Sequence, residues 1–208
     1  MRHRGAPQSA PGKPALPPIE RLFNIALAGS FVGWGLMGLR EEISLVRVSI
    51  AALNGVIAIL LLRRGPELQD GTWRQHLAAL PSLLVAGVVF SRAPQVWEIG
   101  PQVLFLVGTA QTIWAFVFLG RSFAVLPAKR DLVVRGPYQW IRHPAYVGEL
   151  VLVAACAWAT GLAGLWAPIV LLPLLVLRIR AEEELLGALP EWGAFAERVR
   201  WRLLPGVW

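Results

Sequence analysis

Long apolar stretches separated by short polar segments are the dominant pattern along this chain. A helix that spans a membrane needs about 20 mainly apolar residues, within a range of about 17–25. Three stretches reach that range unaided, and three approach it together with their flanking residues. The pattern therefore predicts an all-α integral membrane helical bundle of about six transmembrane helices. The six stretches are Leu22–Leu39, Ile43–Leu62, Leu77–Phe90, Gln102–Gly120, Ala145–Thr160 and Leu162–Leu177.

The last third of the chain adds two features to this bundle. Only a short turn of small residues around Gly161 separates the fifth and sixth stretches, which predicts a tight helical hairpin. After Pro190, the side chains of Trp192, Phe195 and Val199 recur at helical spacing, with arginines between and beyond them. Such an amphipathic segment predicts a C-terminal interfacial helix, and lipid anchoring or core packing explains it without catalysis.

Composition supports a membrane protein with three regions. The chain is 56% hydrophobic and only 16% charged, whereas soluble domains usually carry about a quarter charged residues. Residues 1–18 are basic and rich in proline with little to bury, so we expect a disordered tail. Residues 19–120 form the predicted four-helix transmembrane region, and residues 121–208 the predicted catalytic, cofactor-binding region.

Positive charge lies on one side of the predicted bundle. With six spans, all of the 20 lysine and arginine residues except Arg40, Arg47 and Arg92 fall on the side of the two termini. The positive-inside rule then places the N-terminus and the C-terminus in the cytoplasm, in a membrane of the bacterial inner (plasma) type. Basic loops that face anionic lipid explain the net charge of +7, so no nucleic-acid partner is expected. Nothing in the pattern predicts an oligomeric state.

Two polar segments carry the candidate chemistry, GPYQWIRHPAYVGEL at residues 136–150 and RIRAEEELL at residues 178–186. Ionisable side chains beside or within membrane spans are costly and are therefore functional candidates. If the fifth and sixth stretches form a hairpin, both segments emerge on the same face of the membrane. This arrangement would gather Arg142, His143, Glu149, Arg178, Glu182 and Glu183.

The first segment has features that suit ligand binding. Pro144 is suited to the first turn of a helix, whose free N–H groups and dipole favour an anion such as a carboxylate. Gly136 and Pro137 indicate a turn that brings backbone close to a ligand, and Gly148 removes bulk one helical turn in. Each feature also has an ordinary explanation. Arg142 would reach lipid headgroups, and tyrosines are common at membrane interfaces.

The second segment continues the sixth helix. Glu182 and Glu183 are adjacent, so they point in different directions and cannot both line one pocket. Arg178 lies four residues before Glu182, and these two form a possible pair on the helix surface. Glu183 is then the better candidate to reach a ligand.

Other signatures are missing from the sequence. It contains no Gly-x-Gly-x-x-Gly motif, no phosphate-binding loop and no His-Glu-x-x-His motif. His3 and His76 have no partner at ligand spacing, so no metal is expected. The single cysteine, Cys156, lies within the fifth stretch and is expected to be a small buried residue.

Four strings together resemble the isoprenylcysteine carboxyl methyltransferase family, which has phospholipid methyltransferase relatives. They are GRSFAVLP, GPYQWIRHPAYVGEL, RIRAEEELL and the closing RLLPGVW, between Gly120 and Trp208. Arg-His-Pro-x-Tyr-x-Gly followed by a Glu-Glu pair is specific. Arg-His-Pro-x-Tyr-x-Gly-Glu alone also resembles membrane sterol reductases, which use NADPH.

The resemblance implies a membrane helical bundle that binds S-adenosylmethionine in a cytoplasmic-side pocket and transfers its methyl group. The acceptor would be lipophilic or delivered by the membrane, such as a prenylcysteine-type carboxylate, and bilayer lipid would surround the protein. Arg142 and Arg178 would bind the substrate carboxylate and serve catalysis. The residues implied in cofactor binding are Gly136, Pro137, Tyr138, His143, Pro144, Tyr146, Gly148, Glu182 and Glu183.

The chain departs from the family where tyrosines often follow the Glu-Glu pair, because the nearest residues here are Trp192 and Phe195. The identity of the acceptor, a carboxylate, an amine or a thiol, is therefore left open. Two other functions stay open as well. One is an NADPH-dependent membrane reductase, against which the Glu-Glu segment argues, and the other is a non-catalytic membrane scaffold.

Overall fold

The computed structural model describes residues 17–41, 43–65 and 69–208 and is all-α apart from one minimal strand pair. The predicted disordered tail lies outside the described residues except for its last two positions. Two-residue strands, β1 (Gln69–Asp70) and β2 (Ala128–Lys129), pair antiparallel. The helices are α1 (Pro18–Glu41), α2 (Leu45–Arg63), α3 (Trp73–Ser91), α4 (Ile99–Leu119), α5 (Pro144–Ala159), α6 (Trp166–Leu186) and the short α7 (Trp192–Arg198).

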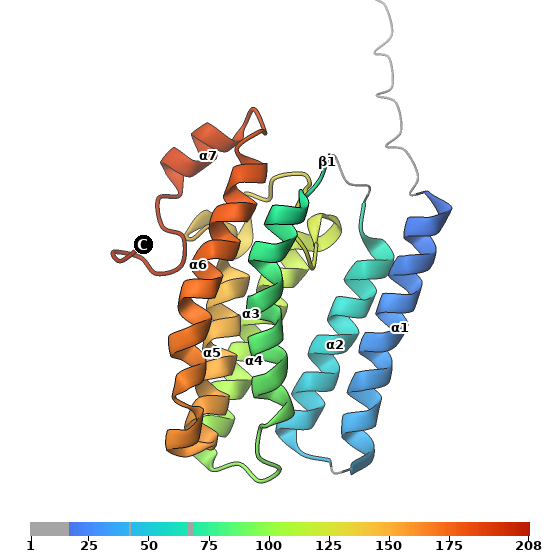
Figure 1. Ribbon diagram of the computed structural model, residues 1–208, viewed down its shortest axis with the longest axis vertical. Helices are drawn as coiled ribbons and strands as arrows, with labels where there is room; N and C mark the ends of the chain where they lie inside the picture. Colours follow the sequence, from blue (N-terminus) through green and yellow to red (C-terminus); the bar gives the residue numbers. More distant parts are fainter. Residues whose placement is uncertain (1–16, 42, 66–68) are drawn as a thin grey trace, which may run out of the picture.

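The six long helices alternate in direction, so that the start of α1 and the end of α6 lie at the same end of the bundle (Figure 1). At that end lie α7 and the strand pair, while the α5–α6 connection lies at the opposite end. Helix α1 packs on α2, α2 on α4, α4 on α5, and α3 on α6. The predicted hairpin is confirmed: one 3₁₀ turn, η3 (Gly161–Gly164), links α5 to α6. Gly161 has a φ of 68°, a backbone conformation that glycine adopts without strain.

Four helices are long and apolar enough to cross a membrane, which supports an integral membrane protein. They are Pro18–Arg40, Leu45–Arg63, Ile99–Ser122 and Gly161–Leu186. Helix α5 is apolar but shorter, and α3 begins with the polar residues Arg74, Gln75 and His76. At most a third of each candidate span is buried within the protein, and large apolar side chains such as Leu22 and Leu62 point outward. Such a surface suits lipid as the solvent.

Helix starts follow local sequence signals. Ser44 caps α2 by accepting a hydrogen bond from the Arg47 backbone N–H at 3.3 Å. Thr72 and Gln75 form a reciprocal capping box at the start of α3. Pro144 opens α5, as predicted, at a position where its missing N–H is not needed.

Small residues bring α4 and α5 into close contact. A Cβ atom added at Gly108 would lie 3.0 Å from Leu152, and one added at Gly148 would overlap the Thr112 hydroxyl. Close backbone approach through small residues is characteristic of helix pairs in membranes. This contact sets the position of α5, which carries the first candidate segment at its N-terminal end.

Candidate functional site

The turn before α5 is built on glycine and proline. Gly136 has a φ of 60°, and a Cβ atom there would run into the Phe118 ring. It opens the 3₁₀ turn η2 (Gly136–Gln139), in which Pro137 and Tyr138 are buried. Gly136 and Pro137 thus hold the turn against α4, and only Tyr138 of the three turns its side chain to the cavity described below.

The Arg-His pair is held by the C-terminal segment of the chain. The backbone N–H of Arg142 donates to the Trp201 carbonyl at 2.9 Å, and that of His143 donates to the Arg202 carbonyl at 2.9 Å. The Arg142 side chain also donates to the carbonyls of Ala196 and Val199, each at 2.7 Å, at the end of α7. Segments almost sixty residues apart in sequence therefore build one structure.

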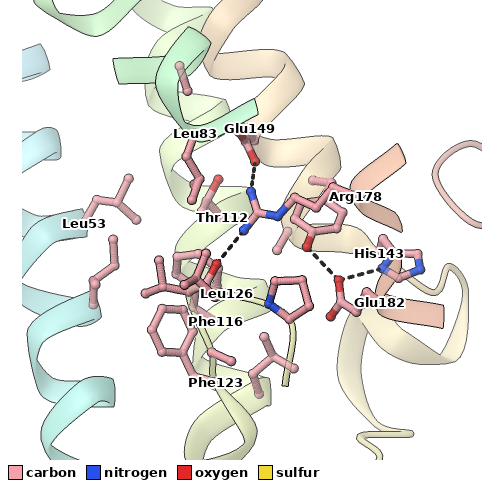
Figure 2. Close-up of a pocket in the computed structure, with 18 of the residues that line it drawn as sticks. Leu53, Leu83, Thr112, Phe116, Phe123, Leu126, His143, Glu149, Arg178 and Glu182 are labelled. Atoms are coloured by element: carbon pink, nitrogen blue, oxygen red, sulfur yellow. Dashed lines mark hydrogen bonds and ion pairs between the residues drawn. The ribbon is translucent and has the colours of Figure 1, made fainter. Parts of the chain in front are cut away.

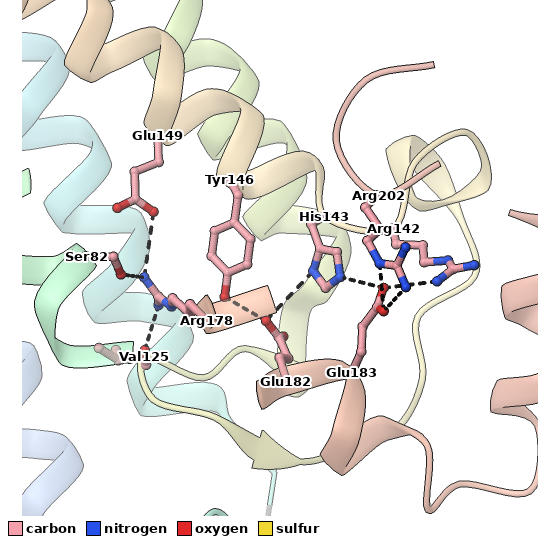
Figure 3. Close-up of polar contacts among 10 residues, drawn as sticks. All are labelled: Ser82, Val125, Arg142, His143, Tyr146, Glu149, Arg178, Glu182, Glu183 and Arg202. Atoms are coloured by element: carbon pink, nitrogen blue, oxygen red, sulfur yellow. Dashed lines mark hydrogen bonds and ion pairs between the residues drawn. The ribbon is translucent and has the colours of Figure 1, made fainter. Parts of the chain in front are cut away.

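His143 lies between the two adjacent glutamates of α6 (Figure 3). Its Nε2 lies 3.3 Å from Glu183 Oε1, and its Nδ1 lies 3.8 Å from Glu182 Oε2. The imidazole is 5% exposed and stacks on the Tyr146 ring, with the ring centroids 5.5 Å apart. Glu182 and Glu183 point to different sides of this histidine, as their adjacency predicts.

Both carboxylate oxygens of Glu183 have partners within the protein. Its Oε1 accepts from Arg142 Nη1 at 3.1 Å, and its Oε2 accepts from Arg202 Nε at 2.8 Å. Arg202 Nη2 lies 2.8 Å from the same Oε2. We call Arg142, His143, Glu183 and Arg202 the ion cluster, and it ties the start of α5 to α6 and to the C-terminal segment.

Glu182 faces the other way. Its Oε2 accepts a hydrogen bond of 2.6 Å from the Tyr146 hydroxyl, and it lines the cavity whereas Glu183 does not. The structure thus turns Glu182 toward the cavity, whereas Glu183, the glutamate preferred from the sequence, points to the ion cluster.

Arg178 is buried deeper in the bundle, on α6. Its Nη2 donates to the Val125 carbonyl at 2.9 Å, and its Nη1 lies 3.3 Å from Ser82 Oγ and 3.7 Å from Glu149 Oε2. The guanidinium carbon also lies 4.8 Å from the centroid of the Tyr146 ring, a cation–π distance. Arg178 therefore pairs with Glu149 of α5 and not with Glu182.

A cavity of about 690 Å³ connects these side chains to the apolar interior (Figure 2). Its other walls are apolar side chains of α1, α2, α3 and α4, among them Trp34, Leu53, Leu83 and Phe116. Of the predicted site residues, Tyr138, Arg142, His143, Tyr146, Arg178 and Glu182 line it. Gly136, Pro137, Pro144, Gly148 and Glu183 are not among its lining residues.

Four buried polar atoms of cavity-lining residues have no hydrogen-bond partner within the part of the chain that the structure describes. They are the Tyr138 hydroxyl, Glu149 Oε1, Asn54 Nδ2 and Arg178 Nε. Burial, and secondarily Glu182, raises the pKa of Tyr138 well above its usual value, so the phenol stays protonated as a donor. Buried polar atoms in proteins are nearly always paired, so these atoms are positions where a ligand or a water molecule would find a hydrogen-bond partner.

Sequence reasoning missed Ser82, Asn54 and Arg202 as neighbours of this site. It placed Glu149 near Arg178 without giving it a role. The signal for Glu149 was its spacing, since it follows Tyr146 by three residues and shares its helix face. No comparable signal existed for Ser82 or Asn54, which lie on other helices. No cluster of three or more His, Cys, Asp or Glu side chains suited to a metal ion occurs among the described residues.

The fold and the site define a helical membrane protein with a polar pocket that opens into an apolar cavity. Residues 100–188 match the isoprenylcysteine carboxyl methyltransferase (ICMT) family. The chain is also 30% identical over 118 residues to the uncharacterized protein YpbQ of Bacillus subtilis (strain 168). That similarity covers 53% of this chain and 69% of the relative. The chain belongs to the ICMT family, which confirms the resemblance drawn from its motifs.

Proposed function

We propose that the protein is an integral membrane methyltransferase that uses S-adenosylmethionine and acts on a lipophilic or membrane-delivered acceptor. Membership of the ICMT family supports methyl transfer. The observation that carries the proposal is the cavity, because it joins the polar wall of His143, Tyr146 and Glu182 to an arm lined by apolar side chains. Such a shape suits a polar cofactor at one end and a hydrocarbon chain at the other. A prenylcysteine-type carboxylate is the acceptor that the family name implies.

The residues present fit S-adenosylmethionine. The cofactor carries hydroxyl and ammonium donors as well as a carboxylate. Glu182 offers a carboxylate acceptor to the donors, and the unpartnered Tyr138 hydroxyl offers a donor to an acceptor group. The positive end of the α5 dipole lies where Ala145 lines the cavity, which favours a carboxylate there. The N–H groups of Tyr146 and Val147 in this turn already donate to the His143 carbonyl, which leaves that of Ala145 for a ligand. The stacked rings of His143 and Tyr146 add aromatic surface for a base.

In this proposal, Glu182 and Tyr138 bind the cofactor, and His143 and Tyr146 shape its pocket. Arg142 and Glu183 act as positioning residues through the ion cluster, and Gly136, Pro137, Pro144 and Gly148 hold the backbone of the pocket in place. The cofactor supplies an electrophilic sulfonium methyl group. The chain aligns the acceptor with that group, which is worth about 7–11 kcal/mol when the geometry is right, and it excludes water.

The proposal extends to topology, with all six long helices crossing the membrane and the pocket on the cytoplasmic side. The alternation of α1 to α6 supports it, because the ends that carry Arg40, Arg47 and Arg92 then lie opposite the pocket. The remaining basic residues that the structure describes share the pocket side, as the positive-inside rule requires of a cytoplasmic face. Helix α7 would lie at the membrane interface while packing Phe195 inward.

Calorimetry of the detergent-purified protein with S-adenosylmethionine, S-adenosylhomocysteine and NADPH tests this function. We expect both adenosyl ligands to bind and NADPH not to bind. A lost hydrogen bond to a charged group costs about 1.5–3 kcal/mol, so Glu182→Gln should weaken S-adenosylhomocysteine binding about 10- to 100-fold. The exposed neighbour Glu184 supplies the control, Glu184→Gln, which should bind like the wild type. Binding of NADPH alone would favour the reductase, and binding of neither ligand would favour a scaffold.

A further inference from the structure

Glu149 has an oxygen that the protein does not use. It lies on the second turn of α5, one helical turn beyond Tyr146, and it lines the cavity (Figures 2 and 3). Its Oε2 lies 3.7 Å from Arg178 Nη1, whereas its Oε1 is buried and has no hydrogen-bond partner within the described chain. A buried carboxylate oxygen without a donor is costly, so this atom indicates the position of a donor on a ligand.

The charges around the cavity favour a neutral acceptor over a carboxylate. Both arginines on the cavity wall already have carboxylate partners, Glu183 for Arg142 and Glu149 for Arg178. The two Nη atoms of Arg178 also contact Ser82 and the Val125 carbonyl, and only Nε has no partner among the described residues. A bidentate grip on a substrate carboxylate needs two nitrogens, so it would break a contact that holds the guanidinium in place. A carboxylate that approached Arg178 would also meet the like charge of Glu149.

We propose that Glu149 Oε1 accepts the proton of a weakly acidic hydroxyl group, so that the acceptor is a lipid-borne hydroxyl of the phenol type. This proposal rests on the proposed methyltransferase function and names the acceptor of that same site. Arg178 of α6 and Tyr146 of α5 are the charged or titratable groups that face Glu149 among the described residues. Helices α3 and α4 present the uncharged Ser82 and Thr112 on this side. Arg178 compensates the charge of the carboxylate before the proton arrives.

The step balances in atoms and electrons. The hydroxyl oxygen forms a bond to the methyl carbon, and the carbon–sulfur bond of the sulfonium breaks with its electron pair left on sulfur. The O–H bond breaks with its pair left on oxygen, and the proton passes to Glu149 Oε1. The products are a methyl ether, S-adenosylhomocysteine and a protonated Glu149, which later releases the proton to water.

The test compares two probes with the same tail and ring, 4-dodecylphenol and 4-dodecylbenzoate, on the wild type and on Glu149→Gln. A general base contributes about 10²–10⁴-fold, so Glu149→Gln should lower methylation of the phenol by at least about 100-fold at neutral pH. The loss should shrink as pH approaches about 10, where a phenol ionises without help. Any methylation of the benzoate should fall far less than that of the phenol in the variant, because a carboxylate needs no base.

A second readout needs no methyl transfer. A nitrophenol analogue of the probe becomes coloured when it loses its proton. In buffer held well below the pKa of the free analogue, where it is uncoloured in solution, it should develop the colour of the anion on the wild type and stay uncoloured on Glu149→Gln. Because the colour can be measured on the wild type alone, it still tests the role of Glu149 if Glu149→Gln fails to fold. No colour change on the wild type would overturn the proposal.

S-adenosylhomocysteine binding, measured on the same samples, separates the two proposals. If the wild type does not bind it, the methyltransferase function itself fails. If the wild type binds it and methylates the benzoate in preference to the phenol, the hydroxyl acceptor is wrong and the methyltransferase stands. Equal phenol methylation by the wild type and Glu149→Gln at neutral pH would likewise remove Glu149 from the reaction.

Discussion

The ion cluster should hold the C-terminal segment on the bundle, and Glu183→Gln probes it directly. The carboxylate oxygens of Glu183 lie 3.1 Å from a nitrogen of Arg142, 3.3 Å from a nitrogen of His143 and 2.8 Å from two nitrogens of Arg202. Glutamine keeps the shape of the side chain and one acceptor oxygen, but it removes the negative charge. Two arginines would then face each other across the site without the anion between them.

The cost follows from how buried each partner is. Glu183 and Arg142 are only 11% and 10% exposed, a setting in which breaking an ion pair costs about 3–5 kcal/mol. Arg202 is 31% exposed, so water screens its share, and exposed pairs are worth about 1 kcal/mol or less. We therefore expect a loss of about 2 kcal/mol, between these limits. That loss corresponds to about thirtyfold more frequent release of the C-terminal segment.

Limited trypsin digestion in detergent measures this release, because the exposed Arg200 lies in the segment that the cluster holds. Glu183→Gln should be cleaved there about thirty times faster than the wild type, and S-adenosylhomocysteine should bind more weakly. Glu184→Gln, which removes the same charge one residue along on an exposed side chain, should be cleaved at the wild-type rate. Equal cleavage of all three proteins would show that the cluster does not hold the segment.

Three further predictions follow from the packing, the cofactor site and the topology. Gly148→Ala should lower the free energy of unfolding by about 1–3 kcal/mol in a denaturant titration, since the new methyl group meets Thr112; Gly193→Ala, with open space around it, should not. Tyr138→Phe should weaken S-adenosylhomocysteine binding severalfold in calorimetry without changing the melting temperature, because its hydroxyl has no partner within the described protein. A reporter fused after Trp208 should read as cytoplasmic, and an external reading would contradict the six-span topology.

Some features of the candidate site can be predicted from residues that are close together in the sequence, and others cannot. The hairpin turn at Gly161 and the start of α5 at Pro144 follow from residues that act on their own backbone, and both appear where the sequence places them. The opposite directions of Glu182 and Glu183 follow from helix geometry alone. Which of the two faces the cavity does not, because Arg202, nineteen residues away in sequence, decides it by binding Glu183.

The number of helices that cross the membrane is likewise only partly predicted by the apolar runs in the sequence. Apolar runs predicted six crossings, and four helices meet that description by length and composition. Helix α3 starts with polar residues, and α5 is held to sixteen residues by Pro144 and the turn at Gly161. Whether such helices cross depends on what covers their polar ends, which is a property of the packed bundle.

The apolar runs, the turn residues and the motifs of the chain predict a lipid environment, the helices, the family and most of the residues near the site. Hydropathy and chain-local geometry carry that information, because each apolar run and each turn residue acts within a few positions. Which charged side chains pair with one another is visible only in the packed structure. That structure pairs Arg178 with Glu149 from a neighbouring helix and encloses Glu183 among two arginines and a histidine. In a low-dielectric interior an ion pair forms only where packing brings both partners together, and spacing along the chain does not reveal that.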